Sequence, residues 1–237
     1  MQRLNPKGIF FDLVDTLVIH DTSPWSLFIG TLRDCLTPKG LALSPTALKI
    51  QCERYFQGVT PPDDGFGLTV FERRIKSFCN AAGLAVTGTD VKKTATHIIE
   101  VWRNHLSLAP DCHHVLETLK RNKKLALVSN YDHPPAIRQL IADMKIEKYF
   151  SAIVISGEVG CQKPNPAIFN LALQKTGLSA GQVLHVGDSE DDINGAISAG
   201  ILPVRIMRTE SGFSDIPTEI PGVRIIKELR TLLELVD

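Results

Sequence analysis

Short apolar runs that alternate with helix-like stretches are the feature that most constrains how this chain can fold. Polar or glycine-containing residues follow each run. The runs, which we interpret as strands, are Gly8–Val14, Leu125–Ser129, Ala152–Ser156, Val183–Gly187 and Leu202–Ile206. Such alternation is typical of a parallel sheet covered by helices. The sequence therefore predicts an α/β fold.

The helix between the third and fourth of these strands carries clear boundary signals. Asn165 can cap its start, Pro166 suits the first helical position, and Gly177 suits the position just past its end. Its expected inner face consists of Ile168, Leu171 and Ala172.

The stretch between the first and second strands has a different pattern. It shows helix-like segments and no convincing strand, and the loop Gly58–Gly67 interrupts it. The expected helices are Pro24–Cys35, Pro45–Phe56, Leu68–Ala82 and Asp90–His105. We therefore predict a core formed by residues 1–17 and 109–237, with a mostly helical insert at 18–108.

Composition narrows the class of partner. Lys plus Arg and Asp plus Glu both number 26, so the chain has no net field to attract nucleic acid or an anionic membrane. The five scattered cysteines form no C-x-x-C pair, which argues against a disulfide framework or a structural zinc site. No secretion signal and no stretch long enough to span a bilayer is apparent. We expect a cytoplasmic protein, as a monomer or homodimer.

Two acidic residues lie at or near the ends of predicted strands. Ligands of open parallel sheets bind outside the carboxyl ends of the strands, where the strand order reverses. Asp188 ends one strand, where it could equally cap the following helix, whereas Asp12 lies inside the first apolar run, where capping is a poor explanation. A buried carboxylate needs a partner or a cation. Converging carboxylates suit Mg²⁺.

Two further residues expected at the same edge of the sheet are of the types that phosphoryl transfer uses. A carboxylate can attack phosphorus, and the transferring oxygens then need hydroxyl or cationic partners. Ser129 ends the second strand and Lys163 precedes the capped helix. Each has a simpler alternative, a turn cap for Ser129 and a solvated charge for Lys163. Together with Asp12 and Asp188 they favour phosphate chemistry.

These residues resemble the four signature motifs of the haloacid dehalogenase (HAD) superfamily, in the order that the superfamily shows. The matching segments are Phe11-Asp12-Leu13-Val14-Asp15-Thr16-Leu17, Val128-Ser129-Asn130, Lys163-Pro164-Asn165-Pro166 and Gly187-Asp188-Ser189-Glu190-Asp191-Asp192. The resemblance implies a Rossmann-like, three-layer parallel sheet with the first strand in the centre, and a helical cap domain inserted after the first motif.

The resemblance also implies roles for individual residues. Asp12 would be the nucleophile and a metal ligand, while Ser129, Asn130 and Lys163 would bind the substrate, with Ser129 and Lys163 also taking part in catalysis. The other implied Mg²⁺ ligands are the backbone carbonyl of Val14, Asp188 and Asp192, with Asp191 as the competitor of Asp192. The expected substrate is a small phosphorylated metabolite.

The chain departs from the superfamily's phosphatase pattern at Val14, where those enzymes carry a second Asp that protonates the leaving oxygen and activates water. Asp15, His20 or His133 could replace it. Three functions follow in order of preference: a phosphatase for leaving groups that need little protonation, a 2-haloacid dehalogenase, and a non-catalytic scaffold that binds a phosphorylated ligand or a protein. Arg205 and Arg208 follow or end the last predicted strand and could touch the substrate, but we expect them to lie on a solvated edge.

Overall fold

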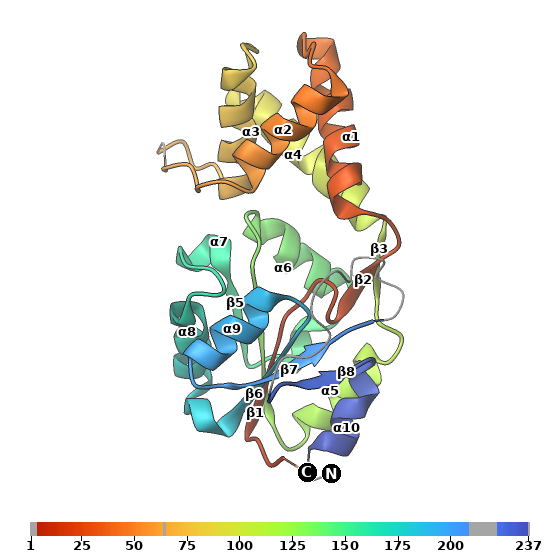
Figure 1. Ribbon diagram of the computed structural model, residues 1–237, viewed down its shortest axis with the longest axis vertical. Helices are drawn as coiled ribbons and strands as arrows, with labels where there is room; N and C mark the ends of the chain where they lie inside the picture. The colour runs from red at the N-terminus through yellow and green to blue at the C-terminus, as the bar shows by residue number, and fades with distance from the viewer. Residues whose placement is uncertain (1–3, 64, 209–221, 237) are drawn as a thin grey trace. The chain divides into compact units, whose positions relative to one another are not determined.

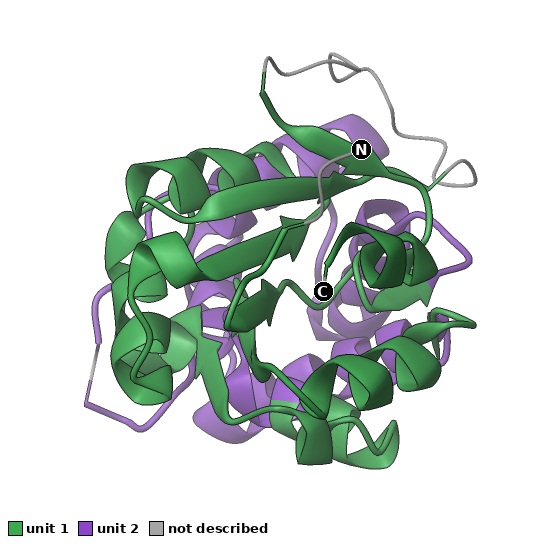
Figure 2. Cartoon of the chain, turned by 90° about the horizontal axis from the view of Figure 1, so that it is seen from below, with its two compact units in different colours: residues 1–19, 107–131, 138–237 green, residues 20–106, 132–137 purple. Residues whose placement is uncertain are grey.

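The computed structural model describes residues 4–63, 65–208 and 222–236. They form two compact units (Figures 1 and 2). The sheet unit comprises Met1–Ile19, Ser107–Tyr131 and Arg138–Asp237, and the helical unit comprises His20–Leu106 and Asp132–Ile137. The chain therefore leaves the sheet unit twice, once after Ile19 and once after Tyr131.

The sheet unit is built on a six-stranded parallel sheet of order β5-β4-β1-β6-β7-β8. The strands are β1 (Gly8–Phe11), β4 (Lys124–Ser129), β5 (Ala152–Ile155), β6 (Val183–Gly187), β7 (Leu202–Ile206) and β8 (Arg224–Ile226). From β1 the chain builds outward through β4 and β5, and then crosses to β6 on the other side of β1. The order therefore reverses between β1 and β6, which is where ligands bind in such sheets.

Helices contact both faces of this sheet. On one face α8 (Pro166–Thr176) packs on β4 and β5, and α9 (Glu190–Ser198) packs on β6 and β7. On the other face α5 (Cys112–Lys120) contacts β4 and α10 (Leu232–Leu235). The other helices with residues in this unit are α6 (Pro134–Asp143) and α7 (Ser156–Val159), with short 3-10 turns at Glu147–Tyr149, Ala180–Gln182 and Leu229–Thr231. This arrangement confirms the predicted α/β class and its Rossmann-like parallel sheet.

Alternate residues of the central strand serve the two faces, as the two-residue period of a strand requires. Phe10 is fully buried and belongs to the cluster under α8 and α9, which includes Ala126, Val128, Ile168 and Phe169. Ile9 and Phe11, its neighbours in sequence, are also fully buried. Burial on both sides explains why β1 is a continuous apolar run rather than an alternating one.

The boundary signals of α8 are confirmed. The Asn165 side chain accepts a hydrogen bond from the Ala167 N–H, Pro166 is the first helical residue, and Gly177 ends the helix in the left-handed conformation with φ 66°. Ile168 and Ala172 are buried as expected, whereas Leu171 is only partly buried and Phe169 takes its place on the inner face.

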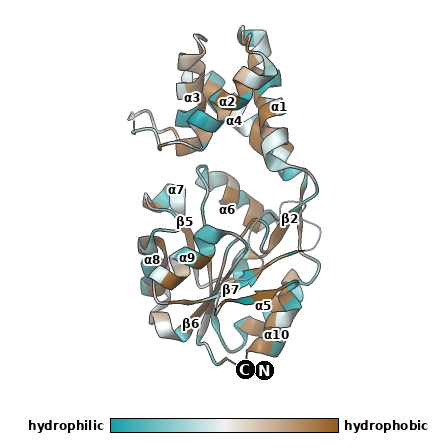
Figure 3. Ribbon diagram, in the orientation of Figure 1, coloured by the Kyte–Doolittle hydropathy of each residue, from teal (hydrophilic) through white to brown (hydrophobic). Residues whose placement is uncertain are grey.

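The helical unit has its own hydrophobic core. Its helices are α1 (Pro24–Leu36), α2 (Pro45–Phe56), α3 (Val70–Ala81) and α4 (Gly88–Arg103), with a 3-10 turn at Thr37–Lys39. The core joins residues from all four helices, among them Leu32, Leu48, Phe78 and Ala95, and Trp25 packs against it. Capping boxes at Thr69 and Thr87 fix the starts of α3 and α4. Hydrophobic residues thus occur in both units (Figure 3).

Three details of the sequence prediction are wrong. β1 ends at Phe11 rather than Val14, because the Leu17 and Val18 N–H groups turn back to the Leu13 carbonyl. The stretch expected to lack strands contains β2 (Val18–His20) and β3 (Leu106–Leu108), which pair in a two-stranded sheet. β8 was not predicted. These strands have only three residues each, too few to show a period-two pattern.

No helix of the described residues is both long enough and apolar enough to cross a membrane. The limits of the predicted core and cap domains stay a prediction.

Candidate active site

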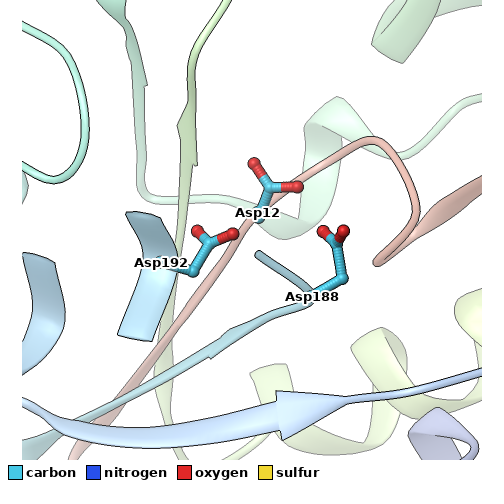
Figure 4. A group of neighbouring side chains, drawn as sticks. All are labelled: Asp12, Asp188 and Asp192. Carbon is cyan, nitrogen blue, oxygen red and sulfur yellow. The ribbon is translucent and has the colours of Figure 1, made fainter. Parts of the chain in front are cut away.

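Three carboxylates from separate segments meet at the edge of the sheet where β1 and β6 end. Asp12 directly follows β1 and Asp188 directly follows β6, and Asp192 lies in the first turn of α9. One oxygen of each carboxylate lies within 4.8 Å of those of the other two (Figure 4). The register fixes this meeting, because Phe11 pairs with Val186 and the Asp12 N–H donates to the Val186 carbonyl at 2.9 Å.

The start of α9 places Asp192 by local means. Ser189 is the N-cap, and Asp192 completes a capping box in which its Oδ2 accepts from the Ser189 hydroxyl at 2.5 Å. Gly187 makes room for it, since a Cβ at this position would stand 2.2 Å from the Asp192 carboxyl carbon. Gly187 therefore leaves space for the Asp192 carboxylate, and Ser189 caps the start of α9.

Lys163 is the buried cation of the cluster. Its side chain is 3% exposed, and Nζ donates to Asp12 Oδ1 at 2.5 Å and to Asp192 Oδ1 at 2.7 Å. Burial by itself would lower the pKa of Lys163, but the two carboxylates outweigh burial and raise that pKa above its usual range. Because Lys163 is buried and bound to two carboxylates, the alternative of a solvated surface charge is wrong.

Asn130 holds the lysine segment in place. Its Nδ2 donates to the Lys163 carbonyl at 3.0 Å, and its Oδ1 accepts from the Lys163 N–H at 2.9 Å. The amide that we expected to bind substrate is therefore engaged with the backbone of Lys163. Ser129 ends β4 and is almost fully buried.

The turn after Asp12 brings a hydroxyl to the cluster. Thr16 is fully buried and its Oγ1 donates to Asp188 Oδ1 at 3.3 Å. Val14 forms an isolated bridge with Val18, and Asp15 adopts a left-handed backbone conformation with φ 62°. Glycine usually occupies such positions because a Cβ strains them.

His185 is a residue of the site that the sequence analysis missed. It lies in β6 with 0% exposure, and its Nε2 is 2.8 Å from Asp192 Oδ1. Burial lowers the pKa of His185, although Asp192 opposes this. A neutral ring that donates its Nε2–H to Asp192 fits both facts. The available signal was a histidine in the middle of an apolar strand, where it needs a polar partner.

Arg205 also corrects the sequence analysis. We expected a solvated edge, but Arg205 is 2% exposed in β7, where it pairs with Gly187, and its Nε donates to the Asp188 carbonyl at 3.2 Å. Arg208 donates to the Thr16 carbonyl at 2.8 Å. Both arginines thus contact the backbone of segments that carry site residues. The sequence did carry a signal for Arg205, because a charged residue inside an apolar strand needs a buried polar partner.

Carboxylates outnumber cations in this cluster, and their proton affinities reflect it. Burial and the neighbouring carboxylates raise the pKa of Asp188 to about 8. Burial also raises the pKa of Asp12 to about 6, although Lys163 lowers it in part. Burial would raise the pKa of Asp192 as well, but Lys163 and His185 outweigh it and hold that pKa well below its usual range.

The donor set of the cluster fits a hard divalent cation. Oxygen ligands of this kind are what Mg²⁺ prefers, and a cation would relieve the repulsion that raises the pKa of Asp188. Asp192 can contribute little by direct coordination, because Lys163, His185 and Ser189 already donate to its two oxygens. Among the described residues, this is the group of acidic side chains close enough to hold such an ion.

The remaining candidates are Asp191, His20 and His133. Asp191, the alternative to Asp192, is exposed. His20 and His133 belong to the helical unit. His133 is half-buried there, with its Nε2 3.9 Å from Glu72 Oε1 and its ring edge-on to Phe71.

Comparison with known proteins agrees with this geometry. Residues 6–200 match the family model described as haloacid dehalogenase-like hydrolase. N-acylneuraminate-9-phosphatase of Mus musculus is 32% identical over 158 residues, which is 63% of this chain and 63% of that protein. The chain thus spans less than two thirds of the length of the N-acylneuraminate-9-phosphatases that it matches.

Two solved structures share the fold over almost the whole chain. The 2-haloacid dehalogenase of Pseudomonas syringae pv. tomato has a TM-score of 0.69 at 24% identity and covers 97% of both chains. The HAD-hydrolase YfnB of Bacillus subtilis, solved bound to magnesium, has a TM-score of 0.65 at 21% identity and covers 99% of this chain and 100% of its own. Because the family model covers well over half of the sequence, the chain belongs to the haloacid dehalogenase-like hydrolase family.

Proposed function

We infer that the protein is a Mg²⁺-dependent phosphatase that acts on a small phosphorylated metabolite through an aspartyl-phosphate on Asp12. The observation that carries this proposal is the buried Lys163 ammonium between two carboxylates at the strand ends, with Asp188 beside them. Phosphatases among the curated relatives add support.

The chemistry divides between two displacements at phosphorus. A carboxylate oxygen of Asp12 attacks, and the bond to the leaving oxygen breaks with its electron pair going to that oxygen. Water then attacks the aspartyl-phosphate, which releases phosphate and regenerates the Asp12 carboxylate, while the proton of the water passes to solvent. With its pKa at about 6, Asp12 is mostly ionised at neutral pH, as a nucleophile must be.

Charge neutralisation is the task of the other residues. Lys163 would offset the charge of Asp12 and of the transferring phosphoryl oxygens, and Ser129 would donate to those oxygens. Asp12, Asp188 and the Val14 carbonyl would hold Mg²⁺ directly, with Asp192 acting through water. The ion, when bound, supplies positive charge to the phosphoryl group.

Val14 sets the substrate class, because its side chain cannot transfer a proton. General acid–base catalysis contributes about 10²–10⁴-fold in rate, so esters whose leaving group must be protonated would react slowly. The favoured substrates are acyl and aryl phosphates, whose leaving oxygens depart as stable anions.

The test measures turnover for a series of phosphate esters that differ in the pKa of the leaving group, with Mg²⁺ and with EDTA. N-acylneuraminate 9-phosphate and phosphoglycolate extend the series to the substrates in the relatives' names. We expect a steep rise in rate as the leaving-group pKa falls, and no turnover with Asp12→Asn. A flat dependence, or activity that survives in Asp12→Asn, would refute the proposal.

The two alternatives have weaker support. A 2-haloacid dehalogenase shares the fold, but the superfamily's dehalogenases need no metal, and Asp188 then has no task in such an enzyme. Halide release from 2-haloacids in EDTA would favour it. A scaffold without catalysis would account for Val14, and it predicts phosphate binding without turnover of any ester in the series.

A further inference from the structure

The segment that follows Ser129 and Asn130 is divided between the two units. Asn130 and Tyr131 belong to the sheet unit, whereas Asp132–Ile137 belongs to the helical unit. The boundary between the units is therefore the peptide bond between Tyr131 and Asp132. Asn130, whose side chain holds the backbone of Lys163, directly precedes Tyr131. Helix α6 begins in the helical unit and continues into the sheet unit from Arg138 onward.

Arg74 of α3 anchors this segment within the helical unit. Its side chain is only 6% exposed, and its Nε donates to Asp132 Oδ2 at 2.6 Å. Its Nη1 donates to the carbonyls of Tyr55 and Gly58 at 2.9 and 3.0 Å, which ties the end of α2 to the same guanidinium. A buried guanidinium with this many acceptors is held in one orientation.

A second set of contacts holds the same segment. The Phe71 N–H donates to the Asp132 carbonyl at 3.0 Å, so both the backbone and the side chain of Asp132 are bound to α3. The next residue, His133, packs its ring edge-on against Phe71 and lies near Glu72. The start of the segment is therefore an integral part of the helical unit.

The two residues before Asp132 are bound just as firmly on the other side of the junction. The Tyr131 N–H donates to Ser156 Oγ at 2.9 Å, and Asn130 exchanges two hydrogen bonds with the backbone of Lys163. Three consecutive residues thus connect the lysine segment, the start of α7 and Arg74. Little slack remains in a chain bound at each successive residue, because a trans peptide fixes neighbouring Cα atoms 3.8 Å apart.

We propose that Arg74 and Asp132 are positioning residues, which hold the chain directly after Ser129 and Asn130 and thereby help to fix the placement of Asn130 and of Lys163, to whose backbone Asn130 is bound. The proposal rests on the proposed function for its catalytic consequence, but the tether itself does not. Arg74 and Asp132 do not contact the substrate in this proposal. They act on Lys163 through Asn130, which is bound to the lysine's backbone.

The first test is amide hydrogen exchange of the full chain without ligand. Arg74→Gln removes the ion pair with Asp132, and Asp132→Asn weakens it, so each should speed exchange in the backbone of residues 130–137 by at least about tenfold. Lys39→Gln is the matched control, because it removes an ion pair of the same 2.6 Å length within the helical unit that does not involve this segment. It should leave residues 130–137 unchanged.

The second test uses reciprocity, since two coupled sites must influence each other equally. Inorganic phosphate with Mg²⁺ should protect amides around Arg74 from exchange in the unmodified protein and in Lys39→Gln. This protection should be lost in Asp132→Asn while phosphate still binds. A change in kcat with little change in KM for a reactive aryl phosphate would accompany it.

The outcomes separate the two proposals. If exchange at residues 130–137 is the same in Asp132→Asn and Lys39→Gln, the tether is refuted, whatever the enzyme does. If Arg74→Gln unfolds the helical unit, Asp132→Asn decides alone, because its side chain is 29% exposed and keeps an oxygen that can accept from Arg74. If phosphate does not bind at all but exchange rises as expected, the tether stands and the phosphatase proposal fails.

Discussion

The two units bury charge in opposite ways. In the sheet unit, Asp12 and Asp192 share Lys163 while Asp188 lies beside them, and the pKa of Asp188 rises to about 8 because of burial and of the other carboxylates. In the helical unit, the buried Arg74 meets one carboxylate, which balances its charge, and three carbonyls.

This difference distinguishes a binding site from a structural contact. A matched network is satisfied by the protein itself and needs nothing from outside. An excess of buried carboxylates costs stability until a proton or a cation balances it. The excess at the end of β1 and β6 is therefore the stronger indication of function in this chain.

The largest expected effect comes from adding a carboxylate to the unbalanced site. Val14→Asp supplies the side chain that the superfamily's phosphatases carry at this position. Turnover of alkyl phosphates should rise by about 10²–10⁴-fold, because the new carboxyl can protonate the leaving oxygen. Steady-state rates with an alkyl and an aryl phosphate measure this, and the aryl phosphate should gain much less.

Val14→Asn is the matched control, with the same shape and no titratable proton. It should leave the rate for alkyl phosphates near that of the unmodified protein. Equal activity of the Asp and Asn variants would mean that another residue, such as Asp15, already acts as the acid.

The next largest effect is a change in the free energy of unfolding that has opposite signs in the two units. Asp188→Asn should stabilise the metal-free protein by roughly 1–3 kcal/mol at pH 8, because it removes a carboxylate whose pKa is raised. Asp132→Asn should destabilise it by about 2 kcal/mol, because it weakens a charged hydrogen bond of Arg74. Urea unfolding of both variants measures the two values.

The pH dependence follows from the same shift. A carboxyl group with a folded-state pKa above its unfolded value of 3.8 binds a proton on folding, so it costs stability as pH rises from about 4 to about 8. The advantage of Asp188→Asn should therefore be absent near pH 4 and complete above pH 8. Saturating Mg²⁺ should reverse its sign, since the unmodified protein alone then gains the binding energy. An advantage that persists in Mg²⁺ would contradict the metal site.

Much of this arrangement was predictable from the sequence, for physical reasons. Asp12 lies in or directly after one apolar run and Asp188 ends another, and parallel strands bring their carboxyl ends to one edge whatever the rest of the chain does. The three-residue strands β2, β3 and β8 were not predictable, because their pairing depends on distant partners and leaves no local period.

The missed residues share another cause. His185 and Arg205 lie inside strands, where the pattern of apolar neighbours predicts burial but cannot show which polar group each will meet. Asp192 Oδ1 and the Asp188 carbonyl, their partners, are brought to them by the turn of α9 and by the sheet register. Such contacts depend on tertiary structure, so only the need for a partner can be read from the sequence.

The smallest expected effect tests whether His185 serves the site or only fills the core. His185→Leu removes the donor to Asp192 and replaces it with an apolar side chain next to Phe169. Asp192 then keeps Lys163 and Ser189 but loses one of its fixed donors, so the lysine that it shares with Asp12 is less well placed. We expect kcat to fall about tenfold, the effect of one hydrogen bond to a charged group, with little loss of stability because the leucine fills the buried volume. His185→Gln keeps a donor and should recover part of the rate. A leucine variant that melts earlier but turns over substrate normally would show that His185 belongs to the core and not to the unbalanced cluster.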